Sequence, residues 1–207
     1  MSTGRPFDAV LCDLDGVLRL WDQEGTDYLD RLCGLPEGTL AGAAFRPERL
    51  LPAITGAVTD EEWRAAVAED LAAAWGQARR RTVMARWDAA VGRVDDEVRA
   101  LLAAARRHVP VVLVSNATSR LEADLARLGL AAALDHVVNT SRLGFAKPDA
   151  RVFAAAAEAA GVPASRCLFV DDTEGHVTAA RAAGMTGLHY REPRQLREAL
   201  VPVTTVA

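Results

Sequence analysis

Several apolar runs in this sequence end in acidic, hydroxyl or amide residues, the side chains that phosphate and metal chemistry uses. Residues 7–12, 109–114 and 167–170 are compact runs that stop abruptly, which is typical of buried strands leading into loops. In an open parallel sheet the ligand site lies beyond the carboxyl ends of the strands, so the polar residues after each run are expected to meet. These residues are Asp13 and Asp15, Ser115 and Asn116, and Asp171 and Asp172, with Lys147 in the loop after a weaker strand candidate near Val137.

The gathered carboxylates predict a divalent cation at this edge of the sheet. Two carboxylates about 5 Å apart repel each other by roughly 3 kcal/mol at an effective dielectric of about 20, more than a surface ion pair returns. Aspartate oxygens suit Mg²⁺, which keeps some of its waters and accepts a substrate phosphate oxygen as a further ligand. The Ser115 hydroxyl and nearby backbone N–H groups can donate to phosphate, and we expect Ser115, Asn116 and Gly16 to contact the substrate.

The spacing of Asp13 and Asp15 assigns them different tasks. In extended chain, residues i and i+2 project to the same side. One carboxylate can therefore attack phosphorus while the other protonates the leaving oxygen and later activates water. Gly16 then lets the backbone turn away from the site.

Each polar pair also has an ordinary structural interpretation. An Asp-x-Asp after a strand is common turn chemistry, and the other motifs in order are what favour catalysis. Ser115 with Asn116, and Asp171 with Asp172, also suit the N-terminal caps of the helices that follow, a role compatible with phosphate contact.

Lys147 is the single lysine among the 24 basic residues of the chain. An isolated lysine is normally a solvated surface charge. In a chain that otherwise uses arginine, it indicates a place where a planar, permanently charged guanidinium does not fit. We therefore predict that Lys147 adds a compact positive charge beside the nucleophile and the phosphate.

Helical patterns alternate with the apolar runs. Asp149 stands at an N-cap position and Gly161 at a C-terminal stop, so a helix is expected between them. Alternating strands and helices predict an α/β fold with a parallel sheet covered on both faces. The helices are expected at residues 94–108, 120–128, 151–160 and 177–183, and weaker strands at 135–139 and 186–190.

Residues 20–91 interrupt the alternation, because they contain no convincing strand. Helical patterns recur near residues 27–33, 47–54 and 60–75. Thr59, with a glutamate three residues later, forms a capping-box pattern for the last of them. The predicted domains are a core of residues 1–19 and 92–207 and a small helical domain of residues 20–91, inserted after the first strand.

The aromatic and sulfur residues are interpreted mainly as core. Trp63, Trp75 and Trp87 recur every 12 residues, close to a helical period, which favours packing inside the inserted domain over substrate contact. Trp21 follows the first motif closely and is the tryptophan nearest the expected site in sequence. Cys12 lies within a strand candidate and is expected to be a small core residue.

The four motifs together resemble the haloacid dehalogenase-like (HAD) hydrolase superfamily. The matching stretches are DLDGV (residues 13–17), VVLVSNAT (111–118), AKPD (146–149) and LFVDDTEGHVTAARAAGM (168–185). The resemblance implies a Rossmann-like, doubly wound core, a mobile helical cap in the insertion, and hydrolysis through an aspartyl-phosphate intermediate.

The resemblance also implies a role for each motif residue. Asp13 would be the nucleophile, Asp15 the general acid and base, Ser115 a phosphate ligand and Lys147 the charge partner. Asp172 would bind Mg²⁺ together with Asp13 and the backbone carbonyl of Asp15, while Asp171 supports the site. Relatives often carry asparagine where this chain has His176, so that side chain receives no role from the resemblance.

Composition limits the partners. The net charge of −4 offers no basic field for nucleic acid, and no apolar run approaches the roughly 20 residues of a membrane span. The polar start MSTGRPFD does not resemble a signal peptide, so we expect a cytoplasmic enzyme with a small phosphorylated substrate. The sequence identifies neither the substrate nor the oligomeric state.

Three other functions compete with a phosphomonoesterase. A sugar phosphomutase of the same superfamily would share the core motifs, because the cap selects the acceptor of the phosphoryl group. A non-catalytic binding relative is disfavoured because every key side chain is present. A signalling receiver domain has a similar acidic set, but its motif order differs and it has no insertion of about 70 residues after the first strand.

Overall fold

The computed structural model describes residues 4–21 and 25–205, and its centre is a five-stranded parallel sheet. The strands are β1 (Ala9–Cys12), β4 (Val111–Ser115), β5 (His136–Asn139), β6 (Cys167–Asp171) and β7 (Thr186–His189). They lie in the order β5-β4-β1-β6-β7, and neighbouring strands run parallel. The predicted parallel sheet is confirmed. Since β1 is central, the loop that follows it lies between the loops that follow β4 and β6.

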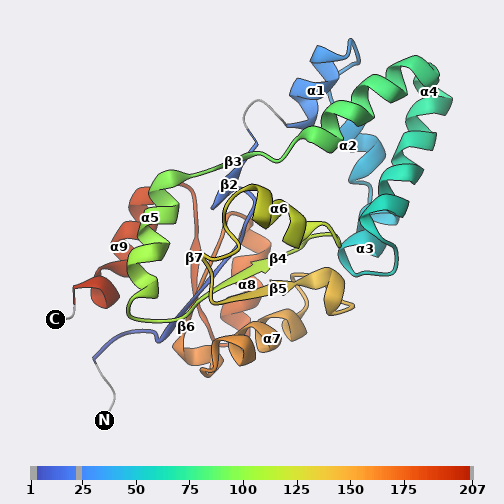
Figure 1. Cartoon of the computed structure of the whole chain (residues 1–207). Helices are drawn as coiled ribbons and strands as arrows, with labels where there is room; N and C mark the ends of the chain where they lie inside the picture. Colours follow the sequence, from blue (N-terminus) through green and yellow to red (C-terminus); the bar gives the residue numbers. More distant parts are fainter. Residues whose placement is uncertain (1–3, 22–24, 206–207) are drawn as a thin grey trace.

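Side chains along each strand alternate between two faces, and helices cover both (Figure 1). Val10 and Cys12 of β1 belong to one buried apolar cluster, and Ala9 and Leu11 to the other. Because both faces are covered, the strand is apolar throughout instead of alternating with polar residues. One face packs against α5 (Asp96–Arg106), α6 (Leu121–Arg127) and α9 (Pro193–Thr204), and the other against α7 (Ala150–Ala160) and α8 (Glu174–Ala182).

Local capping signals begin and end the helices of the core. The Asp149 carboxylate accepts a hydrogen bond from the Arg151 backbone N–H at 2.9 Å, which starts α7 at the predicted position. Gly161 ends the same helix with a φ of +70°, a conformation that costs glycine little. The helix predicted from residue 94 begins instead at Asp96, because the side chain of Asp95 caps it.

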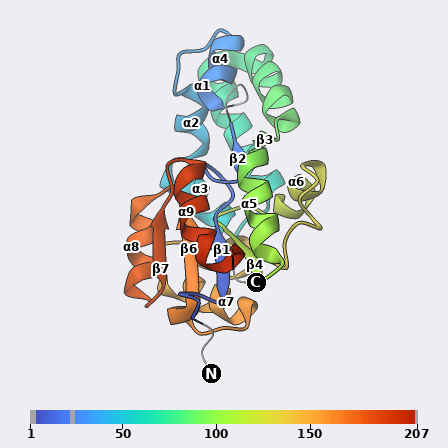
Figure 2. The same cartoon turned by 90° about the vertical axis from the view of Figure 1, so that its left-hand side faces the viewer.

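The strands β2 (Arg19–Leu20) and β3 (Arg93–Val94) pair antiparallel as a short ribbon, and the described residues between them form four helices. These helices, called here the helical unit, are α1 (Thr26–Leu32), α2 (Thr39–Ala44), α3 (Pro47–Ile54) and α4 (Asp60–Ala89). The helical unit lies beyond one end of the sheet (Figures 1 and 2). The sequence patterns predict α1, α3 and the first part of α4. They miss α2, which has only six residues and no side-chain cap.

The helical unit has its own apolar core, and the packing predicted for its tryptophans is confirmed. Trp63 and Trp87 are buried, and Trp75 packs partly buried against the same cluster. The predicted capping box of Thr59 with Glu62 begins α4. This helix of 30 residues is interrupted at Gly76, where φ is +81° and the two parts meet at an angle (Figure 1). No helix within residues 4–21 and 25–205 reaches the length and apolarity of a membrane span.

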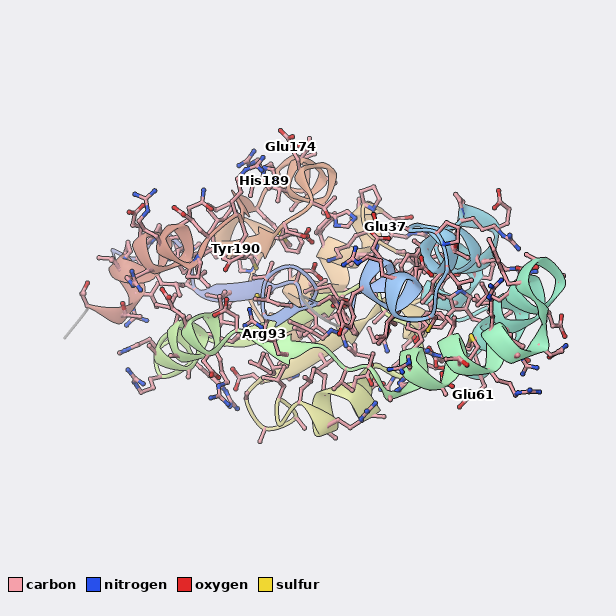
Figure 3. The ribbon with its side chains drawn as sticks, turned by 90° about the horizontal axis from the view of Figure 1, so that it is seen from above. Glu37, Glu61, Arg93, Glu174, His189 and Tyr190 are labelled. Carbon is pink, nitrogen blue, oxygen red and sulfur yellow. The ribbon has the colours of Figure 1, made fainter. Side chains whose placement is uncertain are left out.

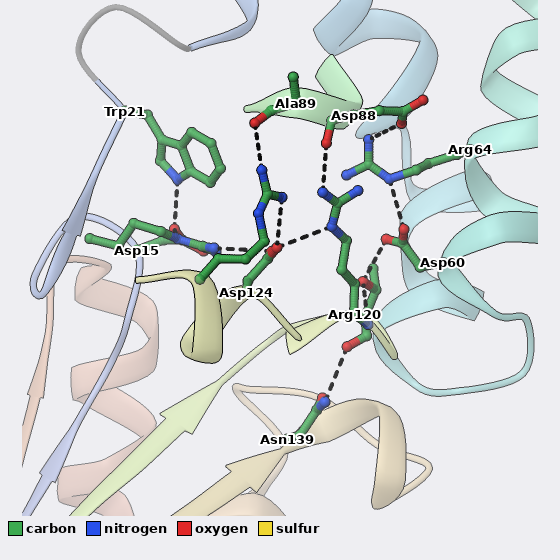
Figure 4. A network of polar contacts seen from close by, with 12 residues as sticks. Asp15, Trp21, Asp60, Arg64, Asp88, Ala89, Arg120, Asp124 and Asn139 are labelled. Carbon is green, nitrogen blue, oxygen red and sulfur yellow. Dashed lines mark hydrogen bonds and ion pairs between the residues drawn. The ribbon is translucent and has the colours of Figure 1, made fainter. Parts of the chain in front are cut away.

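The start of α4 holds the helical unit against the core. The Asp60 backbone N–H donates to Ser119 Oγ at 2.9 Å. The Asp60 carboxylate accepts a hydrogen bond from Thr118 Oγ1 at 2.7 Å (Figure 4). Nearby, a Cβ on Gly56 would lie 1.9 Å from the carbonyl oxygen of Ser141, so the two backbones are in close contact. Seen from above, Glu37 and Glu61 lie on the helical unit and Tyr190 on the core (Figure 3). The helical unit therefore stands over the carboxyl ends of the strands.

Candidate active site

Lys147 is buried, with 4 % of its surface exposed, and links the ends of three strands. Its Nζ donates to Asp13 Oδ1 at 2.8 Å, to Asp171 Oδ2 at 2.7 Å and to the carbonyl oxygen of Val114 at 3.0 Å. Three acceptors satisfy the three donors of an ammonium group. The lysine thus lies beside Asp13, the position expected from the sequence.

Three carboxylates gather next to this lysine. Asp13, Asp171 and Asp172 each offer an oxygen, and these oxygens lie within 4.8 Å of one another. Gly16 brings the loop after β1 against them: its φ is +77°, and a Cβ there would lie 2.0 Å from Asp172 Oδ2. Only glycine allows this approach, so Gly16 acts through the shape of the loop.

Asn116 fastens the loop that carries Lys147. Its side-chain NH₂ donates to the Lys147 carbonyl oxygen at 3.0 Å, and its Oδ1 accepts the Lys147 backbone N–H at 2.8 Å. The alternative that Ser115 and Asn116 cap the next helix is wrong, because α6 begins at Leu121 with Arg120 as its N-cap. The side chain of Asn116 therefore positions Lys147, a role that the sequence did not assign to it.

These residues line one open pocket of about 490 Å³ at the carboxyl end of the sheet. Ser115, at the end of β4, is almost fully buried and contributes to its wall. The structure therefore brings together every site residue predicted from the sequence. The lining consists of Asp13, Asp15, Gly16, Leu20, Trp21, Ser115, Asn116, Lys147, Asp172, Thr173 and His176, while Asp171 lies behind it in contact with Lys147.

Asp15 lines the same pocket, but its carboxylate is held by the chain that leads to the helical unit (Figure 4). Arg19 donates to both of its oxygens, at 2.6 and 2.8 Å, and Trp21 Nε1 donates at 2.6 Å. The prediction that Asp13 and Asp15 project together from extended chain is wrong in its premise. The strand ends at Cys12, and Asp15 lies in a turn in which the Gly16 N–H donates to the Arg19 carbonyl oxygen.

The order of these residues along the chain matches a known family. The model for haloacid dehalogenase-like hydrolases matches residues 7–184, which include every residue of the pocket. The chain belongs to this family. As a HAD-like hydrolase it is an enzyme, and the predicted superfamily is confirmed.

Two relatives are similar in sequence to this chain over different lengths. Phosphatase MT3486 of Mycobacterium tuberculosis (strain CDC 1551 / Oshkosh) is 31 % identical over 202 residues, covering 94 % of this HAD-like hydrolase and 92 % of that protein. The GMP/IMP nucleotidase YrfG of Escherichia coli (strain K12) is 40 % identical over 75 residues, covering 36 % of this chain and 34 % of the nucleotidase. The similarity to a phosphatase thus extends over nearly the whole chain.

Solved structures share the fold of this HAD-like hydrolase. The HAD family enzyme bt-2542 of Bacteroides thetaiotaomicron, in complex with magnesium and inorganic phosphate, superposes with a TM-score of 0.72 at 20 % identity and covers 89 % of this chain and 94 % of its own. The L-2-haloacid dehalogenase of Xanthobacter autotrophicus gives 0.63 at 19 % identity, with 87 % and 76 % covered. The Rossmann-like α/β core is therefore that of the family.

The site of this HAD-like hydrolase carries more negative than positive charge. Burial and the charge of Asp171, opposed by Lys147, together raise the pKa of Asp13 to about 7. Burial and the charge of Asp171 likewise raise the pKa of Asp172. The pKa of Lys147 is raised, because its two carboxylate partners outweigh the effect of burial. Three carboxylates beside one ammonium favour a further cation.

Two histidines complete the surroundings of the aspartate pair. His176 Nδ1, on the first turn of α8, lies 3.1 Å from Asp171 Oδ1, and Thr173 N–H donates to the same oxygen at 2.8 Å. Burial would raise the pKa of Asp171, but the His176 hydrogen bond and Lys147 hold it below its usual value. His189, labelled in Figure 3, places Nε2 2.9 Å from the Asp172 carbonyl oxygen. The sequence assigned neither histidine to the site.

Of the two residues that hold Asp15, the sequence indicated Trp21 as a neighbour of the site but did not indicate Arg19. Trp21 stood out because it follows the first motif closely. Nothing in the sequence distinguished Arg19 from the other arginines, and its contact with Asp15 depends on the turn between them. It is nevertheless buried, and its guanidinium lies 4.6 Å from the centre of the Trp21 ring.

Proposed function

We propose that this HAD-like hydrolase is a Mg²⁺-dependent phosphomonoesterase that forms a phosphoryl intermediate on Asp13 and acts on a small phosphorylated metabolite. The observation that carries the proposal is the contact of buried Lys147 with Asp13 inside a cluster of three carboxylates. The full-length similarity to a phosphatase supports the same reaction. The partial match to a nucleotidase adds nucleoside monophosphates to the candidate substrates.

In this reaction Asp13 is the nucleophile and Asp15 transfers the protons. An oxygen of Asp13 attacks phosphorus, an Asp–phosphorus bond forms, and the bond to the leaving oxygen breaks. Asp15 lines the pocket outside the Lys147 cluster, where both of its oxygens accept hydrogen bonds from Arg19. Once it releases these hydrogen bonds and takes up a proton, it gives that proton to the leaving oxygen. Asp15 then takes a proton from the water that attacks phosphorus, which releases inorganic phosphate and restores Asp13.

The remaining side chains hold and shield the phosphate. Lys147 keeps Asp13 oriented, and the Ser115 hydroxyl together with backbone N–H groups of the loop donates to phosphate oxygens. Asn116 keeps the Lys147 loop in place through its two hydrogen bonds. The helical unit acts as a cap over the pocket and limits the access of water.

The donor set fits Mg²⁺ because it is entirely oxygen and carries excess negative charge. Asp13, Asp172 and the backbone carbonyl of Asp15 would hold the ion, and Asp171 would support them through Lys147 and His176. When bound, Mg²⁺ supplies positive charge that offsets the carboxylates and the phosphate oxygens.

The nucleophile is tested by Asp13→Asn, which keeps the shape of the side chain and removes the attacking carboxylate. Phosphate release from a generic monoester with Mg²⁺ is expected to fall on the order of 1000-fold or more. Asp96→Asn, at a side chain that is 82 % exposed, is the matched control and should stay within about twofold of the wild type. Chelation of Mg²⁺ should abolish the wild-type reaction reversibly.

Near wild-type turnover by Asp13→Asn would exclude the covalent route. Release of inorganic phosphate, measured together with the fate of a sugar phosphate, separates hydrolysis from transfer to a second hydroxyl. Mass spectrometry of the protein quenched during turnover should find one added phosphoryl group, which Asp13→Asn should lack.

A further inference from the structure

A second cavity, of about 320 Å³, lies between the helical unit and the core. It shares three lining residues with the catalytic pocket: Asp15, Trp21 and Asn116. The two spaces are therefore neighbours, and the shared wall contains the residue proposed to protonate the leaving oxygen. The part of a substrate beyond that oxygen would extend into this cavity, whose volume is at the lower end of the range for small-molecule sites.

Aromatic side chains of the helical unit form one wall of the cavity. Phe45 stacks on Trp63 with ring centres 6.3 Å apart, and Trp63 meets Trp87 edge to face at 5.1 Å. Trp63 and Trp87 are buried, but Phe45 remains 45 % exposed. The apolar side chains of Leu50, Ile54, Ala90, Ala117 and Leu121 extend the lining. A partly exposed ring supported by a buried aromatic cluster is suited to contact a flat apolar group.

The charges in the lining already neutralise one another. Arg19 pairs with Asp15 at 2.6 Å, Arg120 with Asp124 at 3.1 Å, and Arg64 with Asp60 at 2.8 Å (Figure 4). Every arginine of this lining, within the described part of the chain, therefore has a carboxylate partner. A second anionic group on the substrate would have to break one of these pairs, which is unfavourable in a partly buried site.

Arg64 is further committed to the aromatic wall, since its guanidinium lies 4.0 Å from the centre of the Trp87 ring. It also donates to Asp88 Oδ1 at 3.1 Å. These contacts occupy two of the five N–H donors of Arg64 and hold its guanidinium against the ring, so it is already paired with two carboxylates. The cavity thus combines an apolar aromatic wall with polar groups that are already paired.

We propose that this cavity receives the leaving group and selects phosphate monoesters of an uncharged alcohol that carries a planar ring, such as a nucleoside or an aryl-substituted alcohol. The inference rests on the phosphatase function proposed above. The Phe45 ring contacts the flat face of the leaving group, and the paired charges disfavour substrates that carry a carboxylate or a second phosphate.

The test compares monoesters of primary alcohols, so that the reacting bond stays alike. Adenosine 5′-monophosphate and benzyl phosphate carry a planar aromatic ring, ribose 5-phosphate has only a non-planar sugar ring, and phosphoglycolate carries an additional carboxylate. With Mg²⁺ present, kcat/KM of the better ring-bearing ester should exceed that of both other esters by at least about tenfold, equivalent to about 1.4 kcal/mol. Equal or faster turnover of ribose 5-phosphate or phosphoglycolate would overturn the inference.

Phe45→Ala tests the wall itself. The ratio of kcat/KM between the better ring-bearing ester and ribose 5-phosphate should fall about tenfold, mainly through KM of the former. Leu51→Ala is the matched control, because Leu51 is 54 % exposed on the same helical unit and does not line the cavity. In the Leu51→Ala variant, the ratio of kcat/KM between the two esters should remain that of the wild type. Phe45→Leu, which keeps apolar volume without a ring, is measured in parallel in case the alanine variant does not fold.

The outcomes separate this inference from the proposed function. If Mg²⁺-dependent hydrolysis is observed but neither Phe45 substitution changes the ratio of kcat/KM between the better ring-bearing ester and ribose 5-phosphate, the proposed role of the cavity is overturned. The proposed phosphatase function would then still stand. Absence of hydrolysis for all four esters and for a generic aryl phosphate overturns both.

Discussion

Lys147 illustrates how a single position determines the choice between two basic residues. Three oxygen acceptors converge on its one nitrogen within 3.0 Å, in a space that is almost closed to solvent. A guanidinium spreads its donors over three nitrogens in a plane and cannot bring them to one point. The geometry therefore explains why a chain that uses arginine elsewhere keeps lysine here.

Removing this charge should destabilise the protein. Lys147→Met keeps an apolar stem but removes the ammonium group that pairs with both buried Asp13 and buried Asp171. At about pH 8 Asp13 is ionised, since its pKa is about 7. Under those conditions, with Mg²⁺ chelated, we expect the free energy of unfolding to fall by about 3 kcal/mol in urea denaturation.

Arg194→Met is the control for that measurement. Its side chain is 69 % exposed and pairs with a glutamate at the surface, so the change should stay within about 0.5 kcal/mol. A loss no larger for Lys147→Met than for this control would contradict the structural role of the buried pair.

At the level of single elements, the interruption of α4 changes what a glycine-to-alanine substitution does. Alanine normally stabilises a helix, but at Gly76 it should destabilise the protein. Gly76 has a φ of +81°, and a Cβ would meet no atom within 4 Å. The effect of a substitution at Gly76 on stability therefore depends only on the backbone conformation. Gly76→Ala should lower the free energy of unfolding by about 1 kcal/mol, because alanine disfavours positive φ.

Gly42→Ala is the comparison, because it should change the free energy of unfolding in the opposite direction. Gly42 lies inside α2, and a Cβ there would also meet no neighbouring atom. Alanine should stabilise this helix by up to about 1 kcal/mol. Urea denaturation measures the free energy of unfolding of both variants. Stabilisation by both substitutions would mean that α4 is one continuous helix.

Asp135 joins three elements, because it stands before β5 and contacts both β4 and α5. Its carboxylate accepts the Val111 N–H at 2.8 Å and the Arg106 Nε–H at 2.8 Å. Burial would raise the pKa of Asp135, but these two hydrogen bonds and the charge of Arg106 hold it below 3.8. Asp135→Asn should cost about 1 kcal/mol at about pH 7.

The pH dependence of that cost has a definite sign. Because the folded pKa lies below the unfolded one, the contribution of the carboxylate is present above about pH 4 and is lost as the pH falls through the folded value. The difference between wild type and Asp135→Asn should therefore shrink in urea denaturation at about pH 3. A difference that grows in acid would contradict this assignment. Glu198→Gln, at an exposed side chain, should show little difference at either pH.

At the scale of the whole molecule, Asp60 connects two bodies with separate apolar cores. It is buried, and its carboxylate accepts from Thr118 Oγ1 at 2.7 Å and from Arg64 Nε at 2.8 Å (Figure 4). Its backbone N–H donates to Ser119 Oγ. Because Thr118 belongs to the loop after β4, this contact connects the proposed cap with the catalytic loop.

A double-mutant cycle measures this connection. Asp60→Asn and Thr118→Val should show a coupling energy of about 1 kcal/mol in the free energy of unfolding, because they share one charge-assisted hydrogen bond. The exposed pair Arg31 and Glu37, which lies within the helical unit, serves as the comparison and should couple by less than about 0.5 kcal/mol. Coupling no stronger at the interface than at this surface pair would mean that the hydrogen bond does not hold the helical unit to the core.

Regular elements with strong local signals are predictable from this chain. The buried strands appear as short apolar runs, and Asp149, Gly161, Thr59 and Glu62 occupy cap positions. α2 is missed because six residues without a side-chain cap leave too little pattern. The orientation of Asp15 is missed because the extended-chain argument requires a strand that in fact ends at Cys12.

Three features are predictable from the order of the residues alone: the family, the parallel sheet, and the meeting of the polar residues that follow its strands. This is possible because parallel strands bring their carboxyl ends to one edge, so order along the chain translates into proximity in space. Three other features become visible only in the folded protein: Arg19 holds Asp15, Asn116 fastens the Lys147 loop, and an aromatic cavity with paired charges opens beside the catalytic pocket. Arg19 meets Asp15 through the turn between them, and Asn116 meets Lys147 where the loops after β4 and β5 adjoin. The cavity forms where the helical unit packs against the core.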